Sequence, residues 1–338
     1  MMQALAATDD LARLGSRLVG WRVLSADPMR RGGNNRIFLL SGEANRAILK
    51  LYPSQPEDPR DRLAQEYAAL SFLRRHGVAD VPRPIACDAA ARCAAFEWID
   101  GAPLDRVGNA DVDELADFFI RLQTLRDHDG AASLADASAA CFSPAMVLEQ
   151  LDGRLERLQQ SIARGTDVAD FVAASLLPAA RRAGERMRAA CATAGVAFAQ
   201  PLDRRLRALS ASDFGFHNAI RRPGGRLAFV DFEYFGWDDP AKAIADVMLH
   251  AGMMLPDELG QRYRARVEAA LADSDGSLSF RLDLLFPSMV LLWCLILLNE
   301  FLPERWTRRA LAGDRDDREA AQATQLRKAR ELFSRNLA

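Results

Sequence analysis

The chain has 338 residues, of which 49% are hydrophobic and 27% are charged; this is typical of a globular protein and too apolar for a disordered one. Its 44 basic and 46 acidic residues give a net charge of -2 at pH 7, so no broad positive field is available and no nucleic-acid partner is expected. Chains above about 250 residues usually divide into smaller units, and two lobes are expected here.

The amino-terminal segment and the cysteines indicate the compartment. Asp9, Asp10, Arg13 and Arg17 interrupt any long apolar stretch near the start of the sequence, so no secretory signal is predicted. The five cysteines are scattered and form no CxxC pair, which indicates neither a disulfide framework nor a zinc site. We therefore expect a cytoplasmic protein.

Short strands are predicted between residues 21 and 51. Residues 36–40 and 46–51 alternate as two strands joined by a turn, and Gly32-Gly33-Asn34-Asn35 forms a loop just before them. Lys50 lies near the end of the second strand and stands out, because the chain contains only three lysines. A Gly-Gly pair is often only a turn, and its position one hairpin before Lys50 is what makes this loop of interest.

A helix is predicted over residues 61–76, ending at Gly77, a residue type common just after a helix. Glu66 falls on the apolar stripe of this helix, between Leu63 and Leu70. A buried carboxylate needs a cationic partner, because an unpaired buried charge is strongly unfavourable. Lys50 is the nearest candidate, and the alternative is that Glu66 lies at the edge of the stripe in water.

A buried strand over residues 93–98 is expected to end the first lobe. Residues 99–103 then break the pattern, so we place an amino-terminal lobe at residues 1–99, a hinge near 96–103 and a carboxy-terminal lobe at 104–338. Helices are expected to predominate in the second lobe, at residues 112–127, 145–163, 168–192, 240–251, 256–272, 282–301 and 315–335.

One apolar run in this second lobe needs a separate interpretation. Residues 284–298 are uncharged but include Pro287, and they fall short of the roughly 20 residues of a membrane span. A buried helix is therefore expected, and no membrane insertion.

A hairpin is the exception among these helices. Residues 219–222 and 226–230 are its predicted arms, and Pro223-Gly224-Gly225 supplies the turn. This pairing places Asn218 beside Asp231. Cross-strand neighbours lie roughly 4.5–5.5 Å apart at Cβ, so the oxygens of these two side chains can flank one Mg²⁺. Asp213 would lie just outside the metal site, free to meet a substrate.

The order of these parts is the order found in phosphoryl-transfer enzymes. Backbone N–H groups of a loop such as Gly32, Gly33 and Asn34 can approach phosphate oxygens, the ammonium of Lys50 can neutralise the α- and β-phosphates, and Glu66 would hold that ammonium in place.

The remaining polar residues complete this arrangement. Asn218 and Asp231 would hold the Mg²⁺ that bridges the phosphates, and Asp213 would orient and deprotonate the attacking hydroxyl. The sequence contains neither a G-x-x-x-x-G-K-[ST] motif nor a G-x-G-x-x-G motif, which removes the P-loop and Rossmann interpretations.

In these motifs the chain resembles the aminoglycoside phosphotransferase and choline kinase-like family, within the protein-kinase-like fold. The resemblance rests on residues 213–218 and on 231–234 (Asp-Phe-Glu-Tyr), followed by Asp239-Pro240 and Asp246. It implies an α+β fold with two lobes, one a small antiparallel sheet with a helix and the other larger and mainly helical, with ATP between them. It also implies that backbone groups around the end of the strand at 93–98 bind the adenine, at Glu97, Trp98 and Ile99.

The chain departs from the family pattern at one place. Ala211-Ser212 precedes Asp213 where the family usually has His-Gly, which puts loop geometry and rate in doubt more than reaction type. His217 is expected to pack or to form a hydrogen bond rather than to catalyse. Asp239 is expected to cap the helix that starts at Pro240.

The leading interpretation is an ATP- and Mg²⁺-dependent O-phosphotransferase that phosphorylates a hydroxyl of a small metabolite such as a sugar, an aminoglycoside or an amino alcohol. The alternative is a nucleotide-binding pseudokinase that acts through a partner protein, motivated by the missing His-Gly. A protein kinase ranks third. Too few residues separate residues 231–233 from the helix predicted at Pro240 to form a long activation segment.

Two properties stay open at this point. Tyr234, Phe235 and Trp237 can face a quaternary ammonium group or, as aromatic clusters more often do, belong to the core. The oligomeric state is not predicted.

Overall fold

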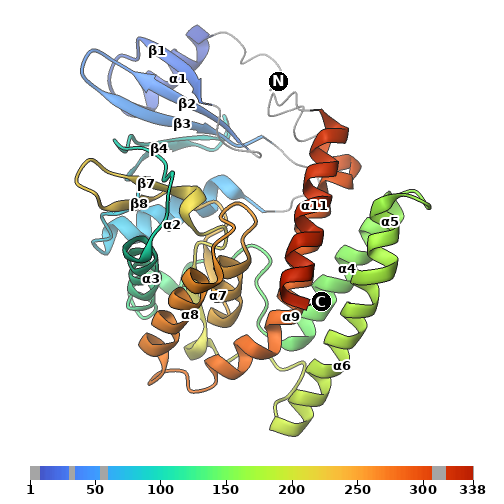
Figure 1. Cartoon of the computed structure of the whole chain (residues 1–338). Helices are drawn as coiled ribbons and strands as arrows, with labels where there is room; N and C mark the ends of the chain where they lie inside the picture. The colour runs from blue at the N-terminus through green and yellow to red at the C-terminus, as the bar shows by residue number, and fades with distance from the viewer. Residues whose placement is uncertain (1–7, 30–34, 54–59, 307–316, 338) are drawn as a thin grey trace.

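The computed structural model describes residues 8–29, 35–53, 60–306 and 317–337. It has the two lobes expected from the sequence (Figure 1). The smaller lobe contains a five-stranded antiparallel sheet in the order β1-β2-β3-β5-β4. The strands are β1 (Ser25–Met29), β2 (Arg36–Ser41), β3 (Arg46–Leu51), β4 (Pro84–Asp88) and β5 (Cys93–Glu97).

The two faces of this sheet are covered by different helices. Side chains alternate along a strand, so Cys93 packs in the cluster under helix α1 (Thr8–Val19), whereas Ala94 and Phe96 pack in the cluster that includes helix α2 (Arg62–Arg75). The predicted strands at residues 36–40, 46–51 and 93–98 are confirmed. Helix α1 and strands β1 and β4 were not predicted as separate elements.

Helix α2 begins and ends as the sequence indicates. The side chain of Asp61 accepts a hydrogen bond from Ala64 N at 3.0 Å, which caps the start. At the other end Gly77 has a φ of +79°, a left-handed conformation that glycine adopts without penalty. The helix predicted over residues 61–76 is therefore confirmed within one residue at each end.

The larger lobe is mainly helical. The predicted helix at 168–192 is interrupted by a π-helical turn at Val172–Leu176. The α-helices are α3 (Asn109–Gln123), α4 (Pro144–Ser161), α5 (Asp167–Phe171), α6 (Leu177–Ala194), α7 (Pro240–Leu249), α8 (Asp257–Leu271), α9 (Leu278–Leu297) and α11 (Arg318–Leu337).

Helix α9 is the central helix of this lobe. With the 3-10 turn after it, it spans Leu278–Phe301, and these 24 residues are long and apolar enough to cross a membrane by length and composition. The helix predicted over residues 282–301 is therefore confirmed except at its start, which lies at Leu278. Because 67% of its most apolar window is buried within the protein and it packs against α4, α6, α7 and α11, its apolar surface forms the core of the lobe.

Two short pairs of antiparallel strands in the larger lobe position the loops that carry Asp213 and Asp231. The predicted hairpin is confirmed as β7 (Ala219–Arg221) and β8 (Leu227–Phe229), with Arg222 N donating to Arg226 O at 2.9 Å. The second pair, β6 (Ala208–Ser210) with β9 (Gly236–Asp238), was not predicted.

Candidate active site

Lys50 lies at the junction of the two lobes. Its Nζ is 2.6 Å from Glu66 Oε2 on α2 and 2.6 Å from Asp231 Oδ1, which follows the β7–β8 hairpin. Glu66 is held in turn by Tyr52, whose hydroxyl donates to Oε2 at 2.6 Å, and by Phe232 N, which donates to Oε1 at 3.1 Å. The predicted pairing of Lys50 with Glu66 is thus confirmed, and the alternative of a solvated Glu66 is wrong.

Asp231 is surrounded by more negative than positive charge. The pKa of Asp231 is raised to about 7, because burial, Glu233 and Glu66 raise it more than Lys50 lowers it. Carboxylate oxygens of these three residues lie within 4.8 Å of one another. Among the described residues their cationic neighbours are Lys50 and Arg62, the latter 3.6 Å from Glu233. Three carboxylates beside two cations fit an added divalent cation such as Mg²⁺, which prefers oxygen ligands.

Asn218 lies beside this cluster as the hairpin register predicts. Val230 N donates to Asn218 O at 2.9 Å. Asn218 therefore lies opposite Val230, the residue just before Asp231. The side-chain NH₂ of Asn218 donates to the backbone oxygen of Asp213 at 2.9 Å. That bond uses the nitrogen and not the amide oxygen, which is the atom suited to a hard cation.

Asp213 is held through one of its two oxygens rather than free on both. Oδ1 lies 2.9 Å from Nε2 of His217 and 2.9 Å from Nε2 of His250, and 38% of the side chain is exposed. Burial raises the pKa of Asp213, but the hydrogen bonds from the two histidines outweigh this and hold it well below its usual range. The carboxylate is therefore ionised at neutral pH.

Residues 25–281 match the family described as "Phosphotransferase enzyme family". The chain belongs to this family. The matched range includes the whole sheet, Lys50, Glu66 and the loops that carry Asp213 and Asp231. A comparison with curated proteins finds no match.

Solved structures share the fold of this phosphotransferase at low sequence identity. Choline kinase LicA from Streptococcus pneumoniae is 16% identical with a TM-score of 0.59, and the match covers 97% of this chain and 98% of that one. Spectinomycin phosphotransferase in complex with ADP and spectinomycin is 12% identical with a TM-score of 0.61, covering 95% and 99%. Macrolide 2'-phosphotransferase from Brachybacterium faecium is 17% identical with a TM-score of 0.56, covering 94% and 97%.

The predicted adenine-binding residues of the phosphotransferase lie at the end of β5. The backbone N–H of Glu97 donates to Arg83 O at 2.9 Å, so Glu97 cannot offer that group to a ligand. The indole of Trp98 donates to Asp100 at 2.8 Å, and Ile99 is buried. Gly32, Gly33 and Asn34 of the glycine loop lie outside the described residues.

Asn35, the first described residue after that loop, is joined to the site. Its side-chain nitrogen donates to Glu233 Oε2, and its buried amide oxygen has no hydrogen-bond partner in the described part of the chain. A buried acceptor of this kind is uncommon in a folded protein and fits a site completed by a ligand. The sequence placed Asn35 in the loop motif but gave no sign of its contact with Glu233.

Two other site features differ in how well the sequence anticipated them. The expectation that His217 forms a hydrogen bond is confirmed, whereas His250 was missed, because it is 37 residues from Asp213 and belongs to no motif. Phe235 and Trp237 are buried, with 1% and 4% exposure, so the core interpretation of these aromatic side chains is correct.

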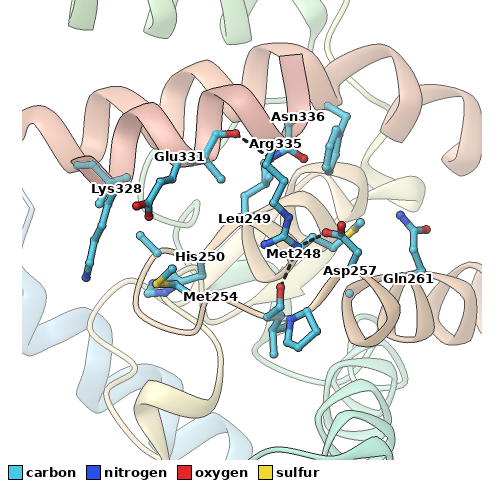
Figure 2. A pocket seen from close by; sticks show the side chains of 17 residues that line it. Met248, Leu249, His250, Met254, Asp257, Gln261, Lys328, Glu331, Arg335 and Asn336 are labelled. Atoms are coloured by element: carbon cyan, nitrogen blue, oxygen red, sulfur yellow. Dashed lines mark hydrogen bonds and ion pairs between the residues drawn. The ribbon is translucent and has the colours of Figure 1, made fainter. Parts of the chain in front are cut away.

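His250 also lines a cavity of about 520 Å³ (Figure 2). Figure 2 shows side chains of α11, including Lys328 and Glu331, facing the segment that carries His250 and Met254. Arg335 of α11 is paired with Asp257 across the same cavity. Its volume is within the range of pockets that hold small molecules.

Proposed function

We propose that this phosphotransferase transfers the γ-phosphoryl group of ATP to a hydroxyl of a small metabolite such as a sugar, an aminoglycoside or an amino alcohol. The observation that carries the proposal is the contact of Lys50 with both Glu66 and Asp231. It places a fixed ammonium beside a carboxylate suited to a divalent cation, close to the loop that carries Asp213. Phosphoryl transfer needs these groups together.

Each residue has a physical role in this proposal. Lys50, held by Glu66, binds the α- and β-phosphates, and Asp213 orients the acceptor hydroxyl and takes its proton. Asn218 and Asp231 hold Mg²⁺, which when bound neutralises charge on the phosphates.

The nucleotide has further contacts in the proposal. The loop at Gly32, Gly33 and Asn34 contacts phosphate oxygens through its backbone. The adenine binds at the backbone of Trp98 and Ile99 and at the carbonyl oxygen of Glu97, since the N–H of Glu97 is already used.

The acceptor has a place in the cavity beside His250. This residue lines the cavity and also contacts Asp213, so a hydroxyl presented from the cavity lies near the proposed base. An aromatic cage for a quaternary ammonium cannot come from Phe235 and Trp237, because both are buried.

We further propose the two-lobe division made from the sequence, residues 1–99 and 104–338 with a hinge near 96–103, and a cytoplasmic location, where ATP is supplied. The five cysteines of the chain are free, which is compatible with a reducing compartment.

The test is phosphate transfer to a broad panel. Purified protein is incubated with Mg²⁺-ATP and sugars, aminoglycosides and amino alcohols, and phosphate adducts are detected by mass spectrometry. An adduct with matching ADP release supports the proposal. No adduct with any acceptor, together with no nucleotide binding, contradicts it.

A pseudokinase is the second candidate. It is favoured by Ala211-Ser212 in place of His-Gly and by the engagement of one oxygen of Asp213 with two histidines. It predicts nucleotide binding without turnover. ADP release measured for the wild type and for Asp213→Asn separates the two, because the substitution lowers turnover only in an active enzyme.

A further inference from the structure

The chain has four histidines, and two of them converge on a single oxygen of Asp213. His217 follows four residues later in a 3-10 turn, Phe216–Asn218, and His250 comes from the end of α7. The side chains of His217 and His250 are 19% and 11% exposed. The pair is therefore a largely buried arrangement built from two separate segments.

Backbone contacts fix the protonation site of His250. Gly252 N donates a hydrogen bond to His250 Nδ1 at 3.0 Å, so Nδ1 carries the lone pair. The ring proton of the neutral form is then on Nε2 and points at Asp213. A Cβ added at Gly252 would lie 2.9 Å from His250 Cε1, so the close approach of this backbone needs a glycine.

The rings themselves are also fixed in orientation. His217 and His250 stack with centroids 3.9 Å apart and planes at 11°, and Trp293 packs against His250 at 4.6 Å. Trp293 is anchored by a hydrogen bond from its indole to Asp246 at 2.9 Å. Nδ1 of His217 is buried without a partner, which favours a neutral ring whose proton is also on Nε2, since a buried N–H without an acceptor is costly.

The same three side chains offer donor atoms of the kind that bind zinc, two imidazole nitrogens and a carboxylate. Metal binding at Nε2 of His250 would move the ring proton to Nδ1, where it would face the N–H of Gly252. Two donors would then oppose each other. The geometry therefore favours hydrogen bonds to Asp213 over a metal site.

We infer that His217 and His250 are positioning residues that clamp Oδ1 of Asp213 and leave Oδ2 to the acceptor. The inference rests on the proposed function. In the reaction, the acceptor oxygen forms a bond to the γ-phosphorus, its proton passes to Oδ2, and the bond from phosphorus to the β–γ bridging oxygen breaks to release ADP. A base held through one oxygen presents the other in one direction, which matters because small displacements of a reacting group lower rates strongly.

This clamp accounts for the departure from the family pattern before Asp213. Ala211-Ser212 replaces the usual His-Gly, and Ser212 has a φ of +65° with its hydroxyl donating to Ser138 O at 3.1 Å. In this chain the carboxylate is held by two histidines that follow it in the sequence. His250 also lines the acceptor cavity, so it connects the base with the site of the acceptor.

Substitution of His250 tests the inference. His250→Phe keeps a ring for stacking and removes the N–H, and kcat is expected to fall about 10- to 100-fold with the KM for ATP unchanged. His250→Gln, which retains a donor, is expected to recover part of kcat. His128→Phe, at an exposed histidine remote from the site, is the matched control and should keep the wild-type kcat. Equal losses in the Phe and Gln variants, or wild-type kcat in both, would overturn the inference.

A second measurement does not depend on turnover, so it separates failure of the clamp from failure of the proposed function. Nitrogen NMR of ¹⁵N-histidine-labelled protein reports which ring nitrogen carries a proton, with signals assigned from His217→Phe and His250→Phe. Protons on Nε2 of both rings are expected at pH 7. A ring whose Nε2 carries no proton would overturn the clamp even in an active enzyme.

Discussion

Asp213 and Asp231 are both partly buried carboxylates, and their surroundings shift their pKa values in opposite directions. Burial and the neighbouring carboxylates together raise the pKa of Asp231 to about 7, against the opposing effect of Lys50. At Asp213 the hydrogen bonds from His217 and His250 exceed the effect of burial and lower the pKa. Such divergent shifts between neighbouring carboxylates are common where the two have different tasks, here a cation ligand and a base.

The base is tested by Asp213→Asn. The amide retains the shape of the side chain but cannot accept the acceptor proton, so kcat is expected to fall about 10²- to 10⁴-fold while nucleotide affinity is unchanged. Steady-state kinetics and nucleotide titration measure the two quantities. Asp273→Asn, at an exposed aspartate, is the control, and an equal loss there or full activity of Asp213→Asn would contradict the role.

The lowered pKa of Asp213 predicts the acid side of the pH–rate profile. A carboxylate whose pKa is lowered stays ionised, so protonation of Asp213 should not reduce kcat between about pH 7 and pH 5. In His250→Phe one donor is lost while burial remains, so the acid limb should move to higher pH. An acid limb that is the same in wild type and His250→Phe would contradict this assignment.

At the scale of single residues, the sequence predicts contacts that periodicity or register determines. Glu66 lies on an apolar stripe, so it needs a cation, and Asn218 is placed beside Asp231 by the hairpin turn. The sequence cannot predict His250, because its contact with Asp213 depends on how the end of α7 packs against a loop 37 residues away.

At the scale of elements, one glycine allows the segment after the sheet to pack against the hairpin of the larger lobe. Gly101 has a φ of +152°, and a Cβ there would lie 2.3 Å from the backbone oxygen of Arg221. The next residue, Ala102, pairs with Arg221 through two hydrogen bonds of 3.1 and 2.8 Å. The segment between the lobes is therefore held against β7, close to Asn218.

Gly101→Ala is expected to lower the free energy of unfolding by about 1–3 kcal/mol, because both the conformation and the contact exclude a Cβ. Gly153→Ala is the matched control. Gly153 is a solvent-exposed residue in the middle of α4 with open space at its Cβ position, so alanine should raise the free energy of unfolding by about 0.5–1 kcal/mol. Urea denaturation measures both. Effects of the same sign would contradict the account.

The accuracy of element prediction followed the strength of local signals. Helix α2 has a cap, an apolar stripe and a terminal glycine, and its limits were predicted within one residue. The pair β6–β9 has three residues in each strand and joins segments more than 25 residues apart. No local pattern indicates such a pairing, yet it frames the loops of Asp213 and Asp231.

At the scale of the whole molecule, Lys50 of the sheet contacts Asp231 of the larger lobe, so a nucleotide bound there contacts both lobes. A ligand that binds the folded state stabilises it by about 2.7 kcal/mol at 100 times its Kd. Mg²⁺-ATP should therefore raise the Tm of the wild type and much less that of Lys50→Met. Arg13→Met, at an exposed basic residue, should respond as the wild type does, and thermal unfolding with and without nucleotide decides.

The two-lobed architecture followed from chain length and motif order, which need no knowledge of packing. The start of α9 at Leu278, before the predicted range of 282–301, did not. Pro287 lies inside the helix, as it does in the predicted range, and burial on several sides overrides its unfavourable propensity. The cavity at His250 also depends on packing, since α7, α8, α9 and α11 enclose it together.

The proposed mechanism requires Lys50, Asn218 and Asp231 to surround a nucleotide with its cation while Asp213 remains free of metal. A crystal structure with Mg²⁺ and a non-hydrolysable ATP analogue would show this arrangement. We expect Mg²⁺ on Asn218 and Asp231, Lys50 at the α- and β-phosphates, and Oδ2 of Asp213 open toward the γ-phosphate. A nucleotide bound elsewhere, or Mg²⁺ coordinated by Asp213, would contradict it.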